Sequence, residues 1–305
     1  MDRPGMQGNE SRGSSVADML ARASIEVTVR DKDVGETLRR HFPQGMDAHV
    51  TFLPDDVLEA AQETCIALHG AGYKPIPHLT ARNFTTRASL DAHLSRLTAE
   101  AHVDEALVIA GDVAAPRGDF AASLDILRTG LLQRHGIKRM RIAGHPEGHP
   151  NVQAPVLEAA LKEKIEFCRA NGLAVEIVTQ FCFEATPIAA WLERIRADGI
   201  DVPVRLGVAG PAGTASLLKF GMRCGVGNSL RALRNRGAQL GKLIGDTTPD
   251  ELLAAVAREL APRTLGPIAG IHLYMFGGVK KTGEWLADAR RRSAADSPLP
   301  TAASA

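Results

Sequence analysis

The chain has 305 residues, of which 45% are hydrophobic and 23% are charged, and its formal net charge is +1. This composition is typical of a soluble globular protein with a full core. A net charge so close to zero argues against a nucleic-acid partner, because phosphate neutralisation needs a basic excess on one face. No apolar run approaches the roughly 20 residues that span a bilayer, and no signal-peptide pattern opens the chain, so we expect no membrane partner.

The four cysteines, Cys65, Cys168, Cys182 and Cys224, are widely spaced and form no CxxC pair. This usage is typical of buried thiols in a reducing compartment. We therefore expect a cytoplasmic protein.

Both ends of the chain differ in composition from the middle. Residues 1–20 are rich in Gly, Ser and charge, and residues 293–305 are rich in Ala, Ser and Pro. Such segments cannot bury enough apolar surface to fold, so the sequence predicts a disordered arm at each end. Residues 21–292 are expected to form one folded domain.

Strand-like and helix-like patterns alternate through this domain. In chain order the sequence predicts a strand at 24–29, a helix at 34–41, a strand at 48–53, a helix at 55–69, a strand at 74–79, a helix at 88–101, a strand at 106–110, a helix at 119–135, a strand at 138–143, a helix at 152–171, a strand at 174–181, a helix at 187–198, a strand at 203–208, helices at 214–224, 229–244 and 248–260, a strand at 270–276 and a helix at 282–292.

Eight strand-then-helix steps with parallel, right-handed connections close into a (β/α)8 TIM barrel. The alternative is an open doubly wound sheet, which normally carries a glycine fingerprint after its first strand. Here Val29 is followed by Arg30-Asp31-Lys32-Asp33, which contains no glycine. The pattern therefore favours the barrel.

The stretch IAGHPEGHPN, residues 142–151, joins the predicted fifth strand to a loop that carries His145, Glu147 and His149. Its two prolines cannot continue a strand or a helix interior, so the loop begins at the carboxyl end of the strand. Loops at that end carry the chemistry of α/β barrels. A polar turn that only reverses the chain is the competing interpretation.

Other predicted strands also end in polar residues, which would converge on the same face of the barrel whatever their separation in sequence. These residues are Glu26, Thr51, His78, Asp112, Gln180 and His272. In an otherwise apolar interior they predict a binding site for a polar ligand. A buried Glu26 without a partner would have a raised pKa and could act as a general acid; the alternative is an inward salt bridge to a Lys or Arg. His78 could also be a core histidine, and Asp112 a turn residue.

Two histidines four residues apart, His145 and His149, raise the question of a metal site. Pro146 prevents the single helical face that an HExxH zinc motif needs. With a third ligand from His78 or His272 the chain could be a zinc amidohydrolase, but its first strand reads IEVTV and lacks the HxH pair usual in such barrels. We expect no metal.

The motifs IEVT, HVTF, PHLTAR, GD, HPEGHPN, LKEKI and TQFCFE occur in an order that resembles the methylenetetrahydrofolate reductase family in its short form, without a regulatory domain. The resemblance covers residues 24–276. It implies a barrel that binds FAD non-covalently and interconverts 5,10-methylenetetrahydrofolate and 5-methyltetrahydrofolate. It also implies NADH or NADPH as electron donor, a small-molecule folate substrate and a homo-oligomer.

The resemblance assigns roles to individual residues. Glu26 matches the glutamate that protonates the folate, and Asp112 matches the aspartate between flavin and pterin. Gln180 and Phe220 match residues that hold the folate. The positions that match flavin contacts are Thr51, His78, Gly111, Asp112, His145, His149 and Lys164. Lys164 would face the pyrophosphate.

Three positions depart from the family pattern. The first strand reads IEVTVR in place of FEFFPP, Ala110 replaces an arginine before Gly111, and His145 replaces a tyrosine. These changes leave the electron donor, the reaction direction and the exact substrate open. A cofactor-free pterin-binding methyltransferase on the same barrel and a non-catalytic folate- or flavin-binding subunit remain as alternatives.

Overall fold

The computed structural model describes residues 15–224, 246–263 and 265–295. In this part of the chain eight parallel strands close into a barrel in the order β1-β10-β7-β6-β5-β4-β3-β2, and β2 pairs with β1. The strands are β1 (Ser24–Thr28), β2 (Asp47–Thr51), β3 (Lys74–Thr80), β4 (Glu105–Ile109), β5 (Arg139–Gly144), β6 (Ala174–Thr179), β7 (Val204–Ala209) and β10 (Ile268–Tyr274). The prediction of a (β/α)8 barrel is confirmed.

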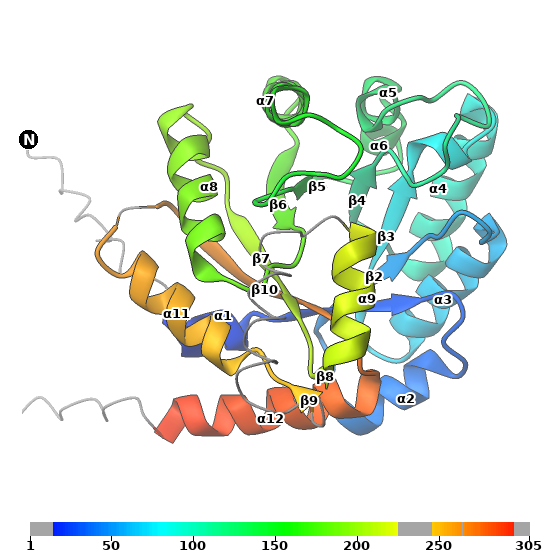
Figure 1. Cartoon of the computed structure of the whole chain (residues 1–305). Coiled ribbons are helices and arrows are strands. Elements are labelled where there is room, and N and C mark those ends of the chain that lie inside the picture. Colours follow the sequence, from blue (N-terminus) through cyan, green and yellow to red (C-terminus); the bar gives the residue numbers. More distant parts are fainter. Residues whose placement is uncertain (1–14, 225–245, 264, 296–305) are drawn as a thin grey trace, which may run out of the picture.

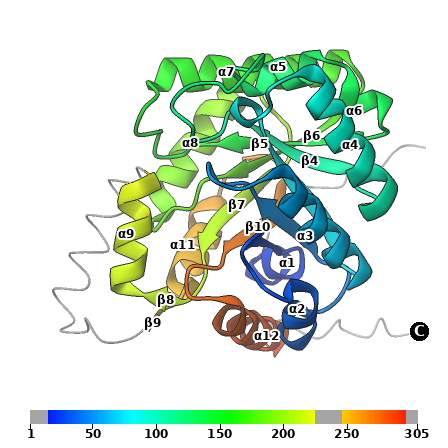
Figure 2. The same ribbon diagram turned by 90° about the vertical axis from the view of Figure 1, so that its right-hand side faces the viewer.

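Helices surround this barrel as a ring (Figures 1 and 2). They are α1 (Val16–Ala21), α2 (Val34–His41), α3 (Leu58–Gly70), α4 (Arg87–Ala101), α5 (Ser123–Arg128), α6 (Leu131–Arg134), α7 (Ala154–Ala170), α8 (Ala185–Ala197), α9 (Thr214–Cys224), α11 (Asp250–Leu260) and α12 (Val279–Ala295). A short 3-10 turn, η1 (Ala81–Asn83), follows β3, and an antiparallel pair, β8 (Ala212–Gly213) and β9 (Asp246–Thr247), lies outside the barrel.

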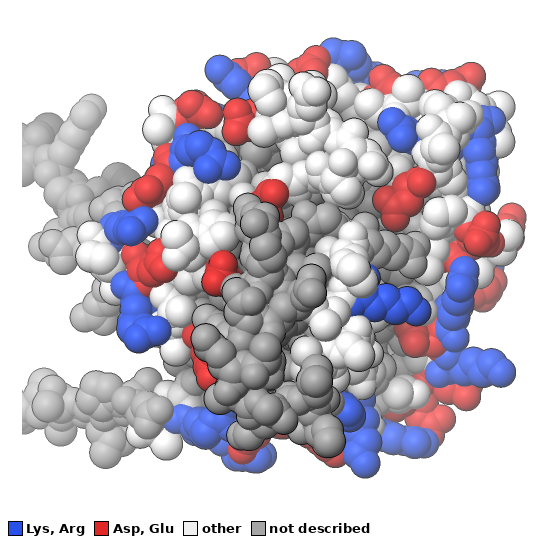
Figure 3. All heavy atoms as spheres, viewed as in Figure 1, with Lys and Arg blue, Asp and Glu red and all other residues white. Residues whose placement is uncertain are grey.

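The outer surface mixes charges of both signs. On the face shown in Figure 3, acidic and basic side chains alternate along the rim formed by the outer helices. Within the described residues no helix is long and apolar enough to cross a bilayer.

One predicted helix, 119–135, is wrong as a single element, because α5 and α6 are separated at Gly130. Gly130 has a φ of +70°, a conformation that ends a helix and that glycine adopts at little cost. The hydroxyl of Thr129 donates to the carbonyl of Ile126 at 2.7 Å and accepts from the amide of Leu131 at 3.1 Å. These bonds close one helix and start the next. The predicted helix 229–244 lies outside the described residues.

The predicted disordered N-terminal arm is wrong at its carboxyl end, where α1 is an ordered helix. Ser15 caps it by accepting a hydrogen bond from the amide of Asp18 at 3.1 Å. Met19 and Leu20 are fully buried, and the helix packs against α11, α12 and β10. Burial of two large apolar side chains explains why this short segment is held. The tail boundary at 293 is also wrong, since α12 continues to Ala295; residues 1–14 and 296–305 lie outside the described part.

The two faces of each barrel strand meet different surroundings. In β1, Ile25 and Val27 are buried in the main hydrophobic core, between the sheet and the outer helices. Because side chains alternate along a strand, Ser24, Glu26 and Thr28 share the opposite face, toward the barrel interior. The strand pattern therefore places Glu26 inside the barrel.

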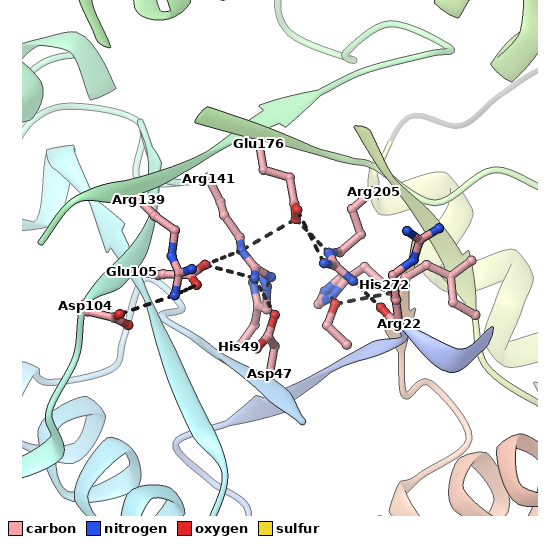
Figure 4. A network of polar contacts seen from close by, with 12 residues as sticks. Arg22, Asp47, His49, Asp104, Glu105, Arg139, Arg141, Glu176, Arg205 and His272 are labelled. Carbon is pink, nitrogen blue, oxygen red and sulfur yellow. Dashed lines mark hydrogen bonds and ion pairs between the residues drawn. The ribbon is translucent and has the colours of Figure 1, made fainter. Parts of the chain in front are cut away.

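The expectation of an apolar interior is wrong, because charged side chains from several strands form a network of ion pairs inside the barrel (Figure 4). Arg141 on β5 hydrogen-bonds Asp47 on β2 and lies 3.0 Å from Glu105 on β4. On the other side, Arg205 on β7 lies 2.7 Å from Glu176 on β6. Since β2 and β5 are not neighbours, the bond between Arg141 and Asp47 crosses the lumen. We call this group the interior ionic network.

Candidate active site

Glu26 lies above the interior ionic network, between two histidines. Its Oε2 is 3.4 Å from Nε2 of His272 on β10 and 3.9 Å from Nε2 of His78 on β3. The alternative of a salt bridge to Lys or Arg does not occur: the ion-pair partners of Glu26 among the described residues are these two histidines. The side chain is 18% exposed. The carboxyl group therefore lies beside two imidazoles and is partly accessible to a ligand.

Burial raises the pKa of Glu26 from 4.5 to about 7, and the proximity of His78 opposes part of this rise. Removing water from a carboxylate disfavours its charged form, and neither neighbour supplies a permanent positive charge. Glu26 is therefore divided between the acid and its carboxylate at neutral pH, as a general acid requires.

The surrounding histidines are neutral at the same pH. Burial lowers the pKa of His78 to about 4 and that of His272 to about 3, the latter helped by Arg205 and Arg141. A third histidine, His49 on β2, is fully buried, and its pKa lies well below the ordinary value for the same reason. Its ring lies 4.3 Å from that of His272 and 5.5 Å from that of His78, measured between ring centroids.

A second group of predicted residues surrounds the loop after β5. The rings of His145 and His149 are 5.4 Å apart, edge to face. Burial lowers the pKa of His145 to about 4, with smaller contributions from His149 and Lys164. Burial likewise lowers the pKa of Lys164 to about 8, while Cys168 acts in the opposite direction. Among the described residues Lys164 has no ion-pair partner, so its half-buried amine can receive an anion.

Asp112 is exposed at the end of β4 and lies close enough to His149 to favour the protonated imidazole, although burial gives that group a net lowered pKa. Gly111 before it has a φ of +92°, and a Cβ there would lie 3.0 Å from Cβ of Thr80. Only glycine fits this position without strain. The Nδ2 of Asn83, buried beside Gly111, has no hydrogen-bond partner among the described residues.

The loop that carries Asp112 is fixed by Arg82, which the sequence analysis did not single out. Its guanidinium donates to the carbonyls of Ala121 at 3.0 Å and Val113 at 3.3 Å. Its own amide donates to the carbonyl of Ala110 at 2.9 Å. A cation that binds several carbonyls orders a loop that has little packing of its own.

Gln180 and Phe220 lie at a third, aromatic part of the site. Gln180 is half-buried directly after β6, and its Oε1 accepts from the amide of Phe181 at 3.2 Å. Phe220 on α9 stacks on Phe276, with centroids 4.2 Å apart and planes 12° apart. Tyr274, 4.9 Å from the His272 ring, connects this aromatic cluster to the histidines.

Thr51, at the edge of the site, forms a hydrogen bond that joins two strands. It is buried, and its hydroxyl donates to the carbonyl of Val27 at 3.2 Å, which ties the end of β2 to β1. The oxygen keeps its lone pairs, so a ligand could still donate to it.

A pocket of about 240 Å³ lies between α7 and α8 and touches the loop after β5, with His145, Glu147 and Trp191 on its lining. Glu26 and Gln180 are not on that lining. The converging side chains at the strand ends, and not this pocket, therefore define the candidate site.

Three residues near the site were not predicted from the sequence: His49, Tyr274 and Phe276. Each lies two or four positions from a residue that was predicted. His49 precedes Thr51 by two, and Tyr274 and Phe276 follow His272 by two and four. Because strand residues two apart share a face, this spacing could have found them. No group of three His, Cys, Asp or Glu side chains in the described ranges has a geometry that could hold a metal ion.

A closed α/β barrel with a protonatable carboxyl group and neutral imidazoles on its strands, and a half-buried amine on a neighbouring helix, is the architecture of a barrel enzyme. The model of one family, described as methylenetetrahydrofolate reductase, matches residues 43–226, which is more than half of the chain. The chain belongs to the methylenetetrahydrofolate reductase family.

Solved structures with similar chain paths are distant in sequence. A dihydropteroate synthase from Thermus thermophilus is 13% identical, with 88% of this chain and 92% of that chain covered and a TM-score of 0.48. The 3-dehydroquinate dehydratase from Aquifex aeolicus is 14% identical, with 88% and 97% covered and a TM-score of 0.44. At this level of similarity neither structure bears on the function.

Proposed function

We propose that the protein is a flavin-dependent oxidoreductase that interconverts 5,10-methylenetetrahydrofolate and 5-methyltetrahydrofolate by hydride transfer through FAD, with NADH or NADPH as the reductive electron donor. Family membership supports the folate substrate. The observation that carries the proposal is the placement of Glu26, whose pKa of about 7 suits a proton donor at neutral pH.

Reduction of the methylene bridge requires a proton as well as a hydride. Opening the five-membered ring of the folate places a proton on a ring nitrogen, so an acid must lie beside the substrate. Glu26 can supply this proton because its side chain is partly exposed above the barrel interior. The histidines beside it stay neutral at pH 7, so they neither hold Glu26 in its ionised form nor repel a cationic intermediate strongly.

Residues near the ends of β3, β4 and β5, together with Lys164 on α7, offer groups that suit a flavin and its diphosphate. Gly111 lets the backbone approach a ligand closely, because no Cβ occupies the space beside Thr80. The Nδ2 of Asn83 is a buried donor without an acceptor among the described residues. Lys164 is a half-buried amine without an ion-pair partner among them. Together with His149 they would hold a flavin and its diphosphate. FAD, when bound, supplies the hydride-transfer chemistry that no side chain can supply.

Gln180 and Phe220 would hold the folate. Gln180 uses its carbonyl oxygen for the Phe181 amide, which leaves its NH₂ group to donate to a pterin. Phe220 presents an aromatic face that already stacks on Phe276 and could stack on an aromatic part of the substrate.

The proposal predicts a direct result with purified protein. The protein should carry or bind FAD and be yellow, and its reduced flavin should be reoxidised by methylenetetrahydrofolate in an anaerobic single-turnover stopped-flow experiment. Flavin that is not reoxidised while the folate binds would favour the non-catalytic subunit. A protein that binds no flavin but transfers a methyl group from a pterin would favour the methyltransferase.

Lys164→Ala should weaken FAD binding, because the change removes the cation placed for the diphosphate. Loss of a charge-assisted hydrogen bond costs about 1.5–3 kcal/mol, or roughly 10- to 150-fold in Kd. Equilibrium titration with FAD measures this change, and circular dichroism checks the fold. The matched control is Lys162→Ala, two residues away on α7 and 59% exposed. Equal Kd values for the two variants would remove Lys164 from the flavin site.

A further inference from the structure

We infer that Arg141 and His49 are positioning residues that act together with burial to keep His78 uncharged and thereby increase the protonated fraction of Glu26 at neutral pH. The inference rests on the proposed role of Glu26 as the proton donor. Neither residue reaches the mouth of the barrel: Arg141 is 3% exposed and His49 is fully buried. Their effect on the substrate would pass through His78 and Glu26.

The first step is the bond between Arg141 and His49. Nη1 of Arg141 lies 2.7 Å from Nε2 of His49. A guanidinium has only donors and keeps its charge at every pH at which the protein is folded. Nε2 of His49 must therefore accept, and the ring proton of neutral His49 must lie on Nδ1.

The second step passes this constraint to His78. Nδ1 of His49 lies 3.3 Å from Nε2 of His78. Since the proton of His49 is on Nδ1, this nitrogen donates and Nε2 of His78 accepts. The lone pair of Nε2 is then occupied, and the proton of His78 is on its other nitrogen. Nε2 is also the atom of His78 nearest to Glu26, so no proton lies on the side of the ring that faces the carboxyl group.

His272, the other neighbour of Glu26, also favours the protonated form of the Glu26 carboxyl group. Nδ1 of His272 is 2.9 Å from Oγ of Ser24, and Oγ lies 3.4 Å from the carbonyl of Ile271, to which it can donate. With Ser24 bonded in this way, Nδ1 of His272 donates to Oγ. Nε2 of His272 is then the acceptor that faces Glu26 at 3.4 Å, and a protonated Glu26 can donate to it.

The remaining charged groups around Glu26 come from the interior ionic network and from β10. Arg141 and Arg205 oppose protonation of His49 and His272, whereas Asp47 and Glu176 favour protonation of His272. Tyr274 on β10 has a pKa well above its ordinary value, mainly through burial, and stays neutral. We call the hydrogen-bonded chain from Arg141 through His49 to His78 the relay. The two arginines favour neutral histidines, as the relay requires, and the carboxylates oppose part of this effect.

Arg141 is held in place by more than His49. It bonds Asp47 and Glu105, and its Nε is 3.6 Å from Glu176. Figure 4 shows Arg141 between these carboxylates and His49. Loss of His49 would leave the guanidinium paired, so a His49 variant can test the relay without leaving a buried charge uncompensated.

His49→Leu should release Nε2 of His78, which removes the hydrogen bond that occupies its lone pair and makes protonation beside Glu26 easier, while burial continues to oppose it. An opposite charge at this distance lowers a carboxyl pKa by about 1–3, so the pKa of Glu26 should fall and that of His78 should rise. Nitrogen NMR of ¹⁵N-histidine-labelled protein follows the tautomers and the titration of His49 and His78. Infrared titration follows the Glu26 carboxyl band, assigned by its absence in Glu26→Gln.

Two further variants separate the relay from packing. His49→Asn keeps an amide donor near the position of Nδ1, so His78 should stay neutral and the Glu26 titration should stay near that of the wild type. His93→Leu removes another buried histidine, which bonds Gln62 at 3.0 Å between α3 and α4, and should leave the Glu26 titration unchanged. The relay is overturned if wild-type His49 carries its proton on Nε2, if wild-type Glu26 titrates near 4.5, or if His49→Leu shifts neither group.

These measurements need no turnover, so they distinguish the relay from the proposed function. If the titrations behave as expected but Glu26→Gln retains the full rate of the folate half-reaction, the relay exists and the role of Glu26 as acid is wrong. If Glu26→Gln abolishes that half-reaction while His49→Leu leaves the titrations in place, the acid is confirmed and the relay fails.

Discussion

Glu26→Gln is expected to slow the reaction between reduced flavin and methylenetetrahydrofolate by roughly 10²- to 10⁴-fold, the contribution of a positioned general acid. Glutamine keeps the shape and the hydrogen bonds of a protonated glutamic acid but has no acidic proton to give. The substitution places no new charge beside His272 or His78, so the barrel should fold as before. FAD binding and reduction of the flavin by its donor should stay near wild-type values.

The two half-reactions can be measured separately by anaerobic stopped-flow, one with the electron donor and one with the folate. The matched control is Glu36→Gln on α2, where the side chain is 64% exposed and pairs with Arg40. That variant should match the wild type in both half-reactions. A folate half-reaction of wild-type rate in Glu26→Gln would make Glu26 structural, and the proton source would then be sought in the loop of His145 and His149.

The pH dependence follows from the direction of the pKa shift. Glu26 is protonated below its folded-state pKa of about 7 and ionised above it. The rate of the folate half-reaction should therefore be highest below pH 7 and fall as the pH rises through that value. If the Arg141–His49 relay holds, the same limb in His49→Leu should lie at lower pH.

The barrel could be predicted because its strands carry a strong local signal. In β1 the sequence SIEVT alternates, and Ile25 and Val27 enter the core behind the sheet. This alternation also predicts that Glu26 faces inward, and it does. Both conclusions need only the period of one strand.

The partners of Glu26 could not be predicted in the same way. His49, His78 and His272 come from β2, β3 and β10, and their heights in the barrel depend on the registers of three strands. A single sequence does not contain these registers. The sequence therefore predicted a buried carboxyl group but left open whether it would lack a partner or form a salt bridge to a Lys or Arg, and it did not indicate the imidazoles of His78 and His272.

The interior ionic network also separates what one strand predicts from what depends on several strands together. The segment RMRI of β5 alternates Arg139 and Arg141 with Met140 and Ile142, and Met140 and Ile142 are fully buried. Alternation gives the strand and the face of each residue, but it cannot say that Arg141 meets Asp47 across the lumen. The expectation of an apolar interior was therefore wrong.

Arg141→Met is expected to be more destabilising than any of the other substitutions proposed here. It removes the guanidinium from Asp47 and Glu105, whose side chains are only 20% and 11% exposed. Breaking a buried ion pair by removing one partner costs about 3–5 kcal/mol, because the remaining charge stays desolvated. The free energy of unfolding, measured by urea denaturation with two independent probes, should fall by about this amount.

Arg139→Met is the matched control on the same strand. Arg139 is 51% exposed, its partner Asp104 is 69% exposed, and Glu105 keeps its ion pair with Arg141, so the loss should be below about 1 kcal/mol. The pH dependence gives a second check. Burial acts to raise the pKa of Asp47, but Arg141 outweighs it and holds the pKa below 3.8. A lowered carboxyl pKa stabilises the fold above the unfolded value and loses that contribution as the pH falls through the folded value. The difference in stability between wild type and Arg141→Met should thus be largest at neutral pH and shrink below about pH 4. An equal loss in the two variants, or a difference that does not change with pH, would show that Arg141 acts through packing and not through its charge.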